Sequence, residues 1–232
     1  MEKFIYPDNM KEIVHRPDIV EYKNVLTKSE CDFLIEYWNS LDDWSLSCFY
    51  NSYVISGKKP NKQEAGYSLR QVQLKSQDLA EKVFKAKLRQ ISLSAHRWDP
   101  GAFAGDHADN AELDGTPNAW EENKFVTMIY LNDNFEGGLL TFRDHELAFK
   151  PETGSFIVFD VGIKNVHAVT EVLSGQRYTM LGSYDYADSS YDKNFQEIKN
   201  LIKLDQDKQK EQWGQGQVMP STIATSYEAV NK

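Results

Sequence analysis

The feature that most constrains the fold is a change in hydrophobic periodicity near residue 92. Beyond it, apolar and polar residues alternate with a period of two, which is typical of β-strands because successive side chains point to opposite faces. The segments with this pattern are 92–98, 124–131, 139–143, 146–150, 155–160, 165–172 and 177–185. Turn residues such as Pro100-Gly101 and Gly137-Gly138 separate them, without an intervening helical pattern. Short strands joined by turns predict an antiparallel sandwich or barrel.

Helical patterns flank this β region. Thr27 and Glu30 have the spacing of a capping box, so a helix is predicted to begin there, with Cys31 and Leu34 on its apolar face. Residues 51–67 have the composition of a loop, and a second helix is predicted at about 76–91. Before the first helix, irregular chain or short strands are expected, with Val20, Tyr22 and Val25 pairing onto a sheet edge.

The predicted organisation is one domain over residues 1–190, mainly β with flanking helices (α+β). Helices within 27–91 are expected to pack on a β core at 92–185. A helical pattern at 191–213 and a polar end predict a C-terminal helix and a mobile tail over 191–232.

Composition narrows the partners. The net charge is −9 and the chain has no basic cluster, which disfavours nucleic acid and anionic membranes as partners. No segment approaches the roughly 20 apolar residues of a membrane span, and residues 1–10 do not resemble a signal peptide, so a cytoplasmic protein is expected. The two cysteines, Cys31 and Cys48, lack a zinc-site pattern and are expected to be reduced.

A candidate metal site begins with His107-Ala108-Asp109. On an extended segment residues i and i+2 point the same way, so this histidine and this carboxylate can share one metal ion. A histidine two residues from an acid also arises by chance, and the alternative is a surface histidine beside a solvated aspartate.

Two residues further along the chain strengthen the metal interpretation. His167 lies within a strand pattern, and Arg177 begins the last strand. Two histidines and one carboxylate leave three positions open on an octahedral iron(II), enough for a bidentate 2-oxo acid and dioxygen. An arginine can clamp the far carboxylate of such an acid. Zinc remains an alternative metal and His145 a rival ligand, whereas His15 and His96 are expected to be structural or exposed.

The order of motifs adds a family resemblance. The motifs are Arg97-Trp98-Asp99-Pro100-Gly101 leading to His107-Ala108-Asp109, Tyr130-Leu131-Asn132, Phe135-Glu136-Gly137-Gly138 with Thr141-Phe142, Pro151-x-x-Gly154-Ser155, His167, and Gly175-x-Arg177. In this order and spacing the chain resembles the prolyl 4-hydroxylase group of iron(II)/2-oxoglutarate oxygenases over about residues 95–184. The segment Leu26 to Cys31 also resembles that group's N-terminal helix.

The resemblance implies a double-stranded β-helix, or jelly roll, with His107, Asp109 and His167 as metal ligands. It implies that Arg177 pairs with the 5-carboxylate of 2-oxoglutarate and that Tyr130 helps to hold it. Thr179, two residues beyond Arg177, is a further candidate for this site. The implied cofactors are iron(II), 2-oxoglutarate and dioxygen, with ascorbate as a candidate reductant.

The reaction implied is hydroxylation of a C–H bond with release of succinate and carbon dioxide, on a prolyl residue of a peptide or protein. Alternatives are a free amino acid or small metabolite as substrate, a non-oxygenase metal cupin, and a catalytically silent binding module. The chain departs from the group at Trp98 and Ala104, where aromatic residues with hydroxyls are frequent, and at Leu139-Leu140. The loops at 52–66 and 110–123 are expected to form the rims of the substrate site, with Trp120 on the second. Oligomeric state does not follow from the sequence.

Overall fold

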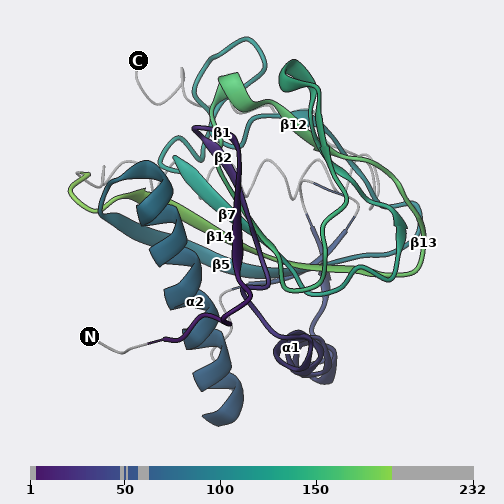
Figure 1. Cartoon of the computed structure of the whole chain (residues 1–232). Coiled ribbons are helices and arrows are strands. Elements are labelled where there is room, and N and C mark those ends of the chain that lie inside the picture. The colour runs from purple at the N-terminus through teal and green to yellow at the C-terminus, as the bar shows by residue number, and fades with distance from the viewer. Residues whose placement is uncertain (1–3, 48–49, 51, 57–62, 190–232) are drawn as a thin grey trace.

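The computed structural model describes residues 4–47, 50, 52–56 and 63–189 (Figure 1). The helices are α1 (Lys28–Ser40) and α2 (Gln63–Phe84), with short 3-10 turns η1 (Arg143–His145) and η2 (Ile163–Asn165). The strands are β1 (Lys11–Arg16), β2 (Ile19–Lys23), β3 (Ser45–Leu46), β4 (Tyr53–Ser56), β5 (Leu88–Trp98), β6 (Ala104–His107), β7 (Phe125–Tyr130), β8 (Glu136–Gly137), β9 (Leu140–Phe142), β10 (Leu147–Phe149), β11 (Phe156–Asp160), β12 (His167–Val169), β13 (Val172–Ser174) and β14 (Arg177–Tyr186).

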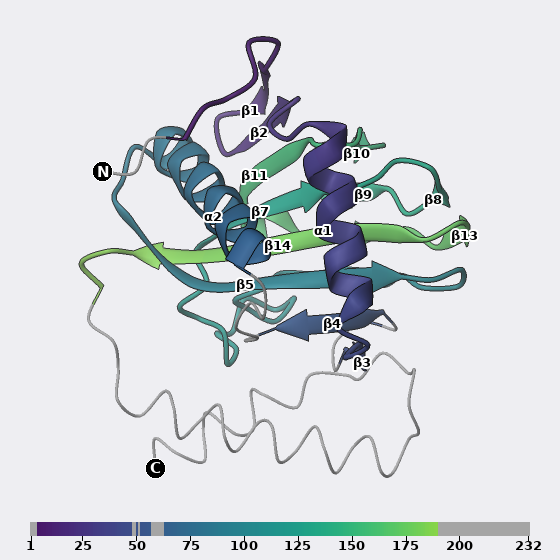
Figure 2. The same cartoon turned by 90° about the horizontal axis from the view of Figure 1, so that it is seen from below.

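These strands form antiparallel sheets in two layers. The larger sheet has eight strands in the order β1-β2-β11-β7-β14-β5-β4-β3. A four-stranded sheet, β10-β9-β12-β6, and a two-stranded sheet, β13-β8, form the second layer. In Figure 1, α1 and α2 lie on one side of β5, β7 and β14, with β12 on the other, and Figure 2 shows both helices crossing the large sheet. The mainly β architecture with helices on one face is as predicted.

Strand β7 shows why the sequence produces two layers. All its residues are buried, because the strand is covered on both faces. Phe125 and Ile129 pack into the cluster shared with the helices, whereas Val126, Met128 and Tyr130 pack into the cluster between the sheets. Period-two alternation therefore divides one strand between two cores.

Helix α1 begins as the sequence predicts. Thr27 is its N-cap, and the reciprocal bonds of a capping box are present: the backbone N–H of Glu30 donates to Thr27 Oγ1, and the Glu30 carboxylate accepts from the Thr27 N–H. Cys31 and Leu34 are buried on its inner face. Burial raises the pKa of the Cys31 thiol to about 12, and the residue is a free cysteine, as expected.

The second helix was predicted too late in the chain. Instead of about 76–91 it spans Gln63–Phe84, so the last five residues of the predicted 51–67 loop are helical. Gly66 sits inside the helix at a cost of about 1 kcal/mol, which burial of neighbours such as Ala65 and Val72 offsets. Lys85, with φ of +52°, ends the helix, and from Leu88 onward the chain pairs with β14 as strand β5.

Other boundaries also differ from the prediction. Val20 and Tyr22 do join the large sheet, but through β2 against β11, while β1 forms the edge and Val25 follows the strand. Strands β3 and β4 were not predicted. The expected strand at 165–172 divides into β12 and β13, which belong to different sheets.

Several expectations lie outside the described residues. They are the helix at 191–213, the tail to 232, Cys48, and residues 57–62 of the first predicted rim loop. In the part of the chain that the structure describes, no helix is both long and apolar enough to cross a membrane.

Candidate active site

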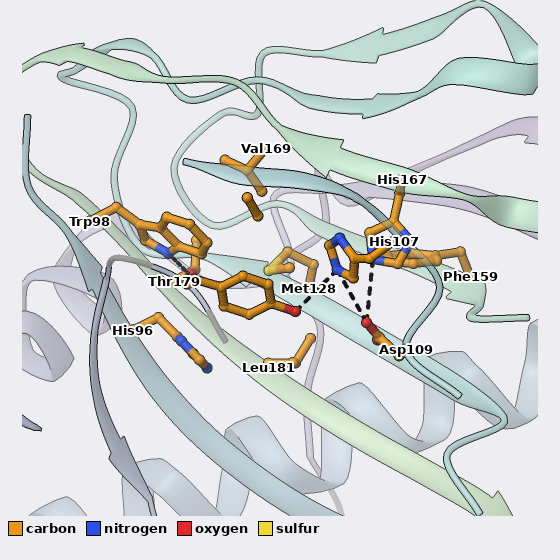
Figure 3. Close-up of a pocket in the computed structure, with 12 residues that line it drawn as sticks. His96, Trp98, His107, Asp109, Met128, Phe159, His167, Val169, Thr179 and Leu181 are labelled. Carbon is orange, nitrogen blue, oxygen red and sulfur yellow. Dashed lines mark hydrogen bonds and ion pairs between the residues drawn. The ribbon is translucent and has the colours of Figure 1, made fainter. Parts of the chain in front are cut away.

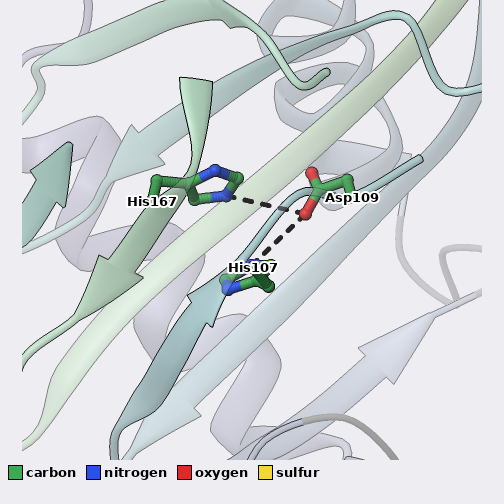
Figure 4. Close-up of side chains that lie close together, drawn as sticks. All are labelled: His107, Asp109 and His167. Carbon is green, nitrogen blue, oxygen red and sulfur yellow. Dashed lines mark ion pairs between the residues drawn. The ribbon is translucent and has the colours of Figure 1, made fainter. Parts of the chain in front are cut away.

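Strand pairing brings the two predicted histidine ligands together. His107 ends β6, and His167 begins β12, and the two are direct partners in the antiparallel register. Side chains on directly opposed residues share one face and lie close to each other. Asp109 follows two residues after His107, where its backbone N–H donates to the Val161 carbonyl at 3.1 Å. The three side chains therefore converge, as Figure 4 shows.

The distances among the three groups are those of a metal-binding cluster. Asp109 Oδ1 lies 3.3 Å from His107 Nε2 and 3.6 Å from His167 Nε2. One possible ligand atom from each residue falls within 4.8 Å of the others, the only such group found among the described residues.

Hydrogen bonds fix which nitrogen of each ring can bind a metal. Nδ1 of His107 lies 2.7 Å from the Gly105 carbonyl oxygen, and Nδ1 of His167 lies 3.0 Å from the Asn165 carbonyl oxygen. A carbonyl only accepts, so in the neutral rings the proton is on Nδ1 and the lone pair is on Nε2. Both Nε2 atoms face Asp109, and carbonyl partners of this kind also orient metal-bound histidines.

The three donor groups influence one another's pKa values. Burial alone would raise the pKa of Asp109, but its contact with His107 and the proximity of His167 hold that pKa below its ordinary value. Burial, and then repulsion from His107, lowers the pKa of His167 to about 4. Burial also opposes the charged form of His107, yet the contact with Asp109 outweighs it and raises this pKa.

Arg177 lies at the other end of the same wall. It begins β14, and Thr179 and Leu181 follow on the same face of that strand and line the pocket. The guanidinium is fully buried between two rings, with Cζ 5.0 Å from the Trp98 centroid and 5.1 Å from the Tyr130 centroid. Nη2 donates to the Tyr130 hydroxyl at 3.4 Å. Among the described residues, Nε and Nη1 have no hydrogen-bond partner.

The pocket thus has a polar end at the ligands and leads toward the arginine. Figure 3 shows His107, Asp109 and His167 at one end and Trp98 and Thr179 at the other. The lining between them is largely apolar and includes Met128, Phe159, Val169 and Leu181. The Thr179 hydroxyl accepts from Trp98 Nε1 at 3.3 Å.

Sequence reasoning missed two residues of this pocket. His96 was expected to be structural or exposed, but it is buried and lines the cavity, and burial lowers its pKa to about 4. It lies two residues before Trp98, so the period of two could have placed it on the inner face. Tyr50 also lines the pocket, yet it comes from the connection between β3 and β4, and no sequence pattern pointed to it.

The remaining candidates fall away from the cluster. The rival ligand His145 lies on η1 and contacts the Asn165 side-chain oxygen at 2.8 Å, outside the metal-binding group. His15 contacts Glu21. In the 110–123 loop, Asn118 donates to the Asp109 carbonyl at 3.2 Å, whereas Trp120 is not among the residues that line the pocket.

Comparison with known proteins finds a family match over the candidate site. The model of the 2OG-Fe(II) oxygenase superfamily matches residues 93–185, the region that contains all three candidate ligands and Arg177. The match covers less than half of the chain. It agrees with the predicted cofactors iron(II), 2-oxoglutarate and dioxygen. Two imidazoles and one carboxylate with open positions are the donor set that non-haem iron(II) oxygenases use, so the residues present fit the metal.

The proteins to which this chain is similar include prolyl hydroxylases. The chain is 31% identical over 113 residues to human prolyl 3-hydroxylase 3, an alignment that covers 44% of this chain and 15% of that protein. Its fold resembles a viral collagen prolyl hydroxylase from Paramecium Bursaria Chlorella virus-1, solved as a 2OG complex, with a TM-score of 0.58, 20% identity, and coverage of 73% of this chain and 96% of that one.

A second solved structure shares the fold. It is a Trichoplax adhaerens prolyl hydroxylase bound to a hypoxia inducible factor peptide fragment, with a TM-score of 0.58, 13% identity, and coverage of 77% of this chain and 90% of that one. These likenesses confirm the predicted double-stranded β-helix.

Proposed function

We propose that this oxygenase hydroxylates prolyl residues of a peptide or protein, with conversion of 2-oxoglutarate to succinate and carbon dioxide. The observation that carries the co-substrate assignment is Arg177, a fully buried guanidinium with two N–H groups unpaired among the described residues. A buried charge of this kind calls for a carboxylate. The metal-binding cluster lines a pocket whose wall includes Trp98, and Arg177 packs on that indole, so a dicarboxylic 2-oxo acid would extend from the cluster toward the arginine.

Each side chain has a defined part in this scheme. His107, Asp109 and His167 would hold the iron, and Arg177 with Tyr130 would hold the far carboxylate. When bound, iron(II) with 2-oxoglutarate and dioxygen would supply the oxidation that replaces a C–H hydrogen with hydroxyl, one oxygen atom going to the substrate and the other to succinate. The apolar lining excludes water around the reacting atoms, which strengthens the electrostatic contacts made there.

The prolyl assignment is supported by the relatives. The human protein that aligns with 44% of this chain is named a prolyl 3-hydroxylase, and the order of motifs resembles the prolyl 4-hydroxylase group. Because the chain spans 15% of that relative's length, the substrate of the whole relative reaches this chain only as a proposal.

The test is product mass and position. The protein is incubated in air with iron(II), 2-oxoglutarate and ascorbate, against a panel of proline peptides and free amino acids. We expect one added oxygen on a prolyl ring, equimolar succinate, and loss of both in Asp109→Ala. Asp106→Ala is the matched control, because this neighbouring carboxylate on β6 is exposed and pairs with Arg143 at 3.0 Å instead. Turnover of 2-oxoglutarate stimulated only by non-prolyl small molecules would contradict the prolyl assignment, and no succinate at all would favour a non-oxygenase cupin.

A further inference from the structure

The pocket contains a buried histidine to which the proposed scheme gives no role. His96 lies on β5 and lines the pocket together with His107, Asp109 and His167. The residue is only 8% exposed. It does not belong to the metal-binding cluster, which consists of the other three residues. A polar ring in this place can instead contact a bound ligand directly.

One ring nitrogen of His96 has no hydrogen-bond partner. Nε2 lies 2.9 Å from the Ser94 hydroxyl oxygen. Nδ1 is buried and makes no hydrogen bond within the part of the chain that the structure describes. Leaving a buried polar atom unpaired costs about 1–3 kcal/mol, so a ligand that supplies the missing partner gains that free energy on binding.

The strand register places His96 one step from the arginine. Along β14 and β5, Arg177 is the direct partner of Trp98, and Thr179 is the direct partner of His96. Residues two apart on a strand share one face and lie about 6.7 Å from each other, which is comparable to the length of a five-carbon diacid. In Figure 3, His96 lies on the same side of the pocket as Leu181, opposite Val169. A diacid held at one end by Arg177 therefore brings its other end to the level of His96.

The charge state of the ring decides what it can bind. Burial, and then the charge of Arg177, lowers the pKa of His96 to about 4, whereas Asp109 acts in the opposite direction. The ring is therefore neutral at pH 7 and carries one proton. The Ser94 hydroxyl can donate to Nε2 as well as accept from it, and when it donates, the proton is on Nδ1. Nδ1–H is then a neutral donor that faces a ligand in the pocket.

We propose that His96 binds the co-substrate by donating a hydrogen bond from Nδ1 to the 1-carboxylate of 2-oxoglutarate, an inference that rests on the proposed function. The oxygen atoms at this end of the keto acid only accept hydrogen bonds, and those of the carboxylate carry the charge that strengthens such a bond. Arg177 would hold the 5-carboxylate, and His96 would orient the end that chelates the metal.

The experiment removes Nδ1 but keeps the ring. His96→Phe has nearly the same shape without nitrogen, whereas His96→Asn retains an N–H donor at the position of Nδ1. His15→Phe is the matched control, because this histidine lies on the edge strand β1, contacts Glu21 and does not line the pocket. Cobalt(II) affinity is measured first without keto acid. Iron(II) protein is then titrated with 2-oxoglutarate under anaerobic conditions, and the visible charge-transfer band of the chelate is followed.

We expect His96→Phe to bind cobalt(II) as tightly as the wild type, because the metal-binding cluster does not include His96. Its 2-oxoglutarate affinity should fall about 10- to 100-fold, the range for loss of one hydrogen bond to a charged group. The maximum of the chelate band should also move, since the lost hydrogen bond acted on a group that binds the metal. His96→Asn should recover part of the affinity, and His15→Phe should match the wild type in every measurement.

Three results would overturn the proposal. Unchanged 2-oxoglutarate affinity in His96→Phe would mean that Nδ1 does not contact the keto acid. An equal loss of affinity in His96→Phe and His96→Asn, with the band unmoved, would mean that the ring only supports the wall of the pocket. Weaker cobalt(II) binding would mean that His96 acts on the metal ligands instead. A wild-type protein that forms no chelate band would contradict the proposed function itself, and the His96 role with it.

Discussion

Replacing Arg177 with methionine should separate its cost to stability from its contribution to binding. The guanidinium is 0% exposed, and burial lowers its pKa despite the opposing influence of Tyr130. Its hydrogen bonding among the described residues is limited to the 3.4 Å contact with the Tyr130 hydroxyl. Methionine is of similar length and carries no charge, so Arg177→Met removes the charge without opening a large cavity.

The free energies involved predict that Arg177→Met has little effect on stability, or raises it, without 2-oxoglutarate, but weakens the binding of 2-oxoglutarate. Burying an ion costs several kcal/mol, whereas the two ring contacts return about 0.5–2 kcal/mol each. Without 2-oxoglutarate, Arg177→Met should therefore be as stable as the wild type or more stable by about 1 kcal/mol. With ligand, loss of a charge-assisted pair of about 2–4 kcal/mol should weaken 2-oxoglutarate binding about 30- to 700-fold.

Urea unfolding with saturating metal, with and without 2-oxoglutarate, measures both effects. At 100 times its dissociation constant the ligand should stabilise the wild type by about 2.7 kcal/mol. The same concentration should stabilise Arg177→Met by about 0.1–0.9 kcal/mol, and Arg177→Lys by an intermediate amount. Arg70→Met, on the exposed face of α2, is the control and should retain the full gain. A full ligand-dependent gain in Arg177→Met would refute the role of Arg177, and a loss above 2 kcal/mol without ligand would refute the energetic argument.

Three further predictions concern the scaffold and can be measured by the same unfolding experiment. Gly154→Ala should lower the free energy of unfolding by more than 3 kcal/mol, because φ is +79° and a Cβ there would lie 2.2 Å from the Leu26 carbonyl oxygen. Gly101→Ala, with φ of +88° and open space around it, should lower it by about 1 kcal/mol. Thr27→Ala should cost about 1 kcal/mol through loss of the α1 cap, and equal stability would contradict the capping role. Burial alone would raise the pKa of Glu81, but its hydrogen bonds outweigh burial and hold that pKa below its ordinary value. The contribution of Glu81 to stability is therefore complete above about pH 4.5 and is lost as the pH falls through the lowered pKa. Glu81→Gln should be less stable than the wild type at pH 7, with a smaller difference in the free energy of unfolding at pH 3.

Local pattern was sufficient where one interaction decided the structure. The capping box placed the start of α1, and alternation placed β7 and β14 within one residue. The glycine motifs also have a local cause, since Gly154 needs a positive φ and close approach to a neighbouring carbonyl.

Local pattern failed where tertiary contacts outweighed propensity. Gly66 and the polar residues around it read as a loop, yet the segment is helical because Ala65, Val72 and Leu79 bury their side chains against the sheet. Conversely, Leu88 and Ile91 fit a helical spacing but lie in β5, which pairs with β14, since the left-handed residue Lys85 stops the helix.

The site residues also separate into those that sequence patterns predicted and one that they did not. His107 and Asp109 could be predicted from their spacing, and His167 and Arg177 from the order of strands, because an antiparallel roll brings such positions together. Tyr50 could not, since it lies between β3 and β4, two strands that no sequence pattern predicted.

The two layers also explain why this site combines a metal end and a carboxylate end. The histidines belong to β6 and β12 of the small sheet, whereas Arg177 and Thr179 belong to β14 of the large one. Sheets that pack face to face lie about 10 Å apart, so a ligand that bridges them must carry one group for each layer.

Core packing between the layers, through residues such as Phe142 and Phe159, holds that separation constant. Under the proposed function, selectivity for a five-carbon dicarboxylic keto acid would therefore depend on the spacing of the sheets as much as on the residues that touch it. Phe142→Ala makes a cavity between the layers and should weaken 2-oxoglutarate binding although Arg177 remains. Phe84→Ala, on the helix side of the large sheet, should destabilise the fold but leave the 2-oxoglutarate affinity of the folded protein unchanged. Equal affinity in both variants, measured by the anaerobic titration, would contradict this dependence on sheet spacing.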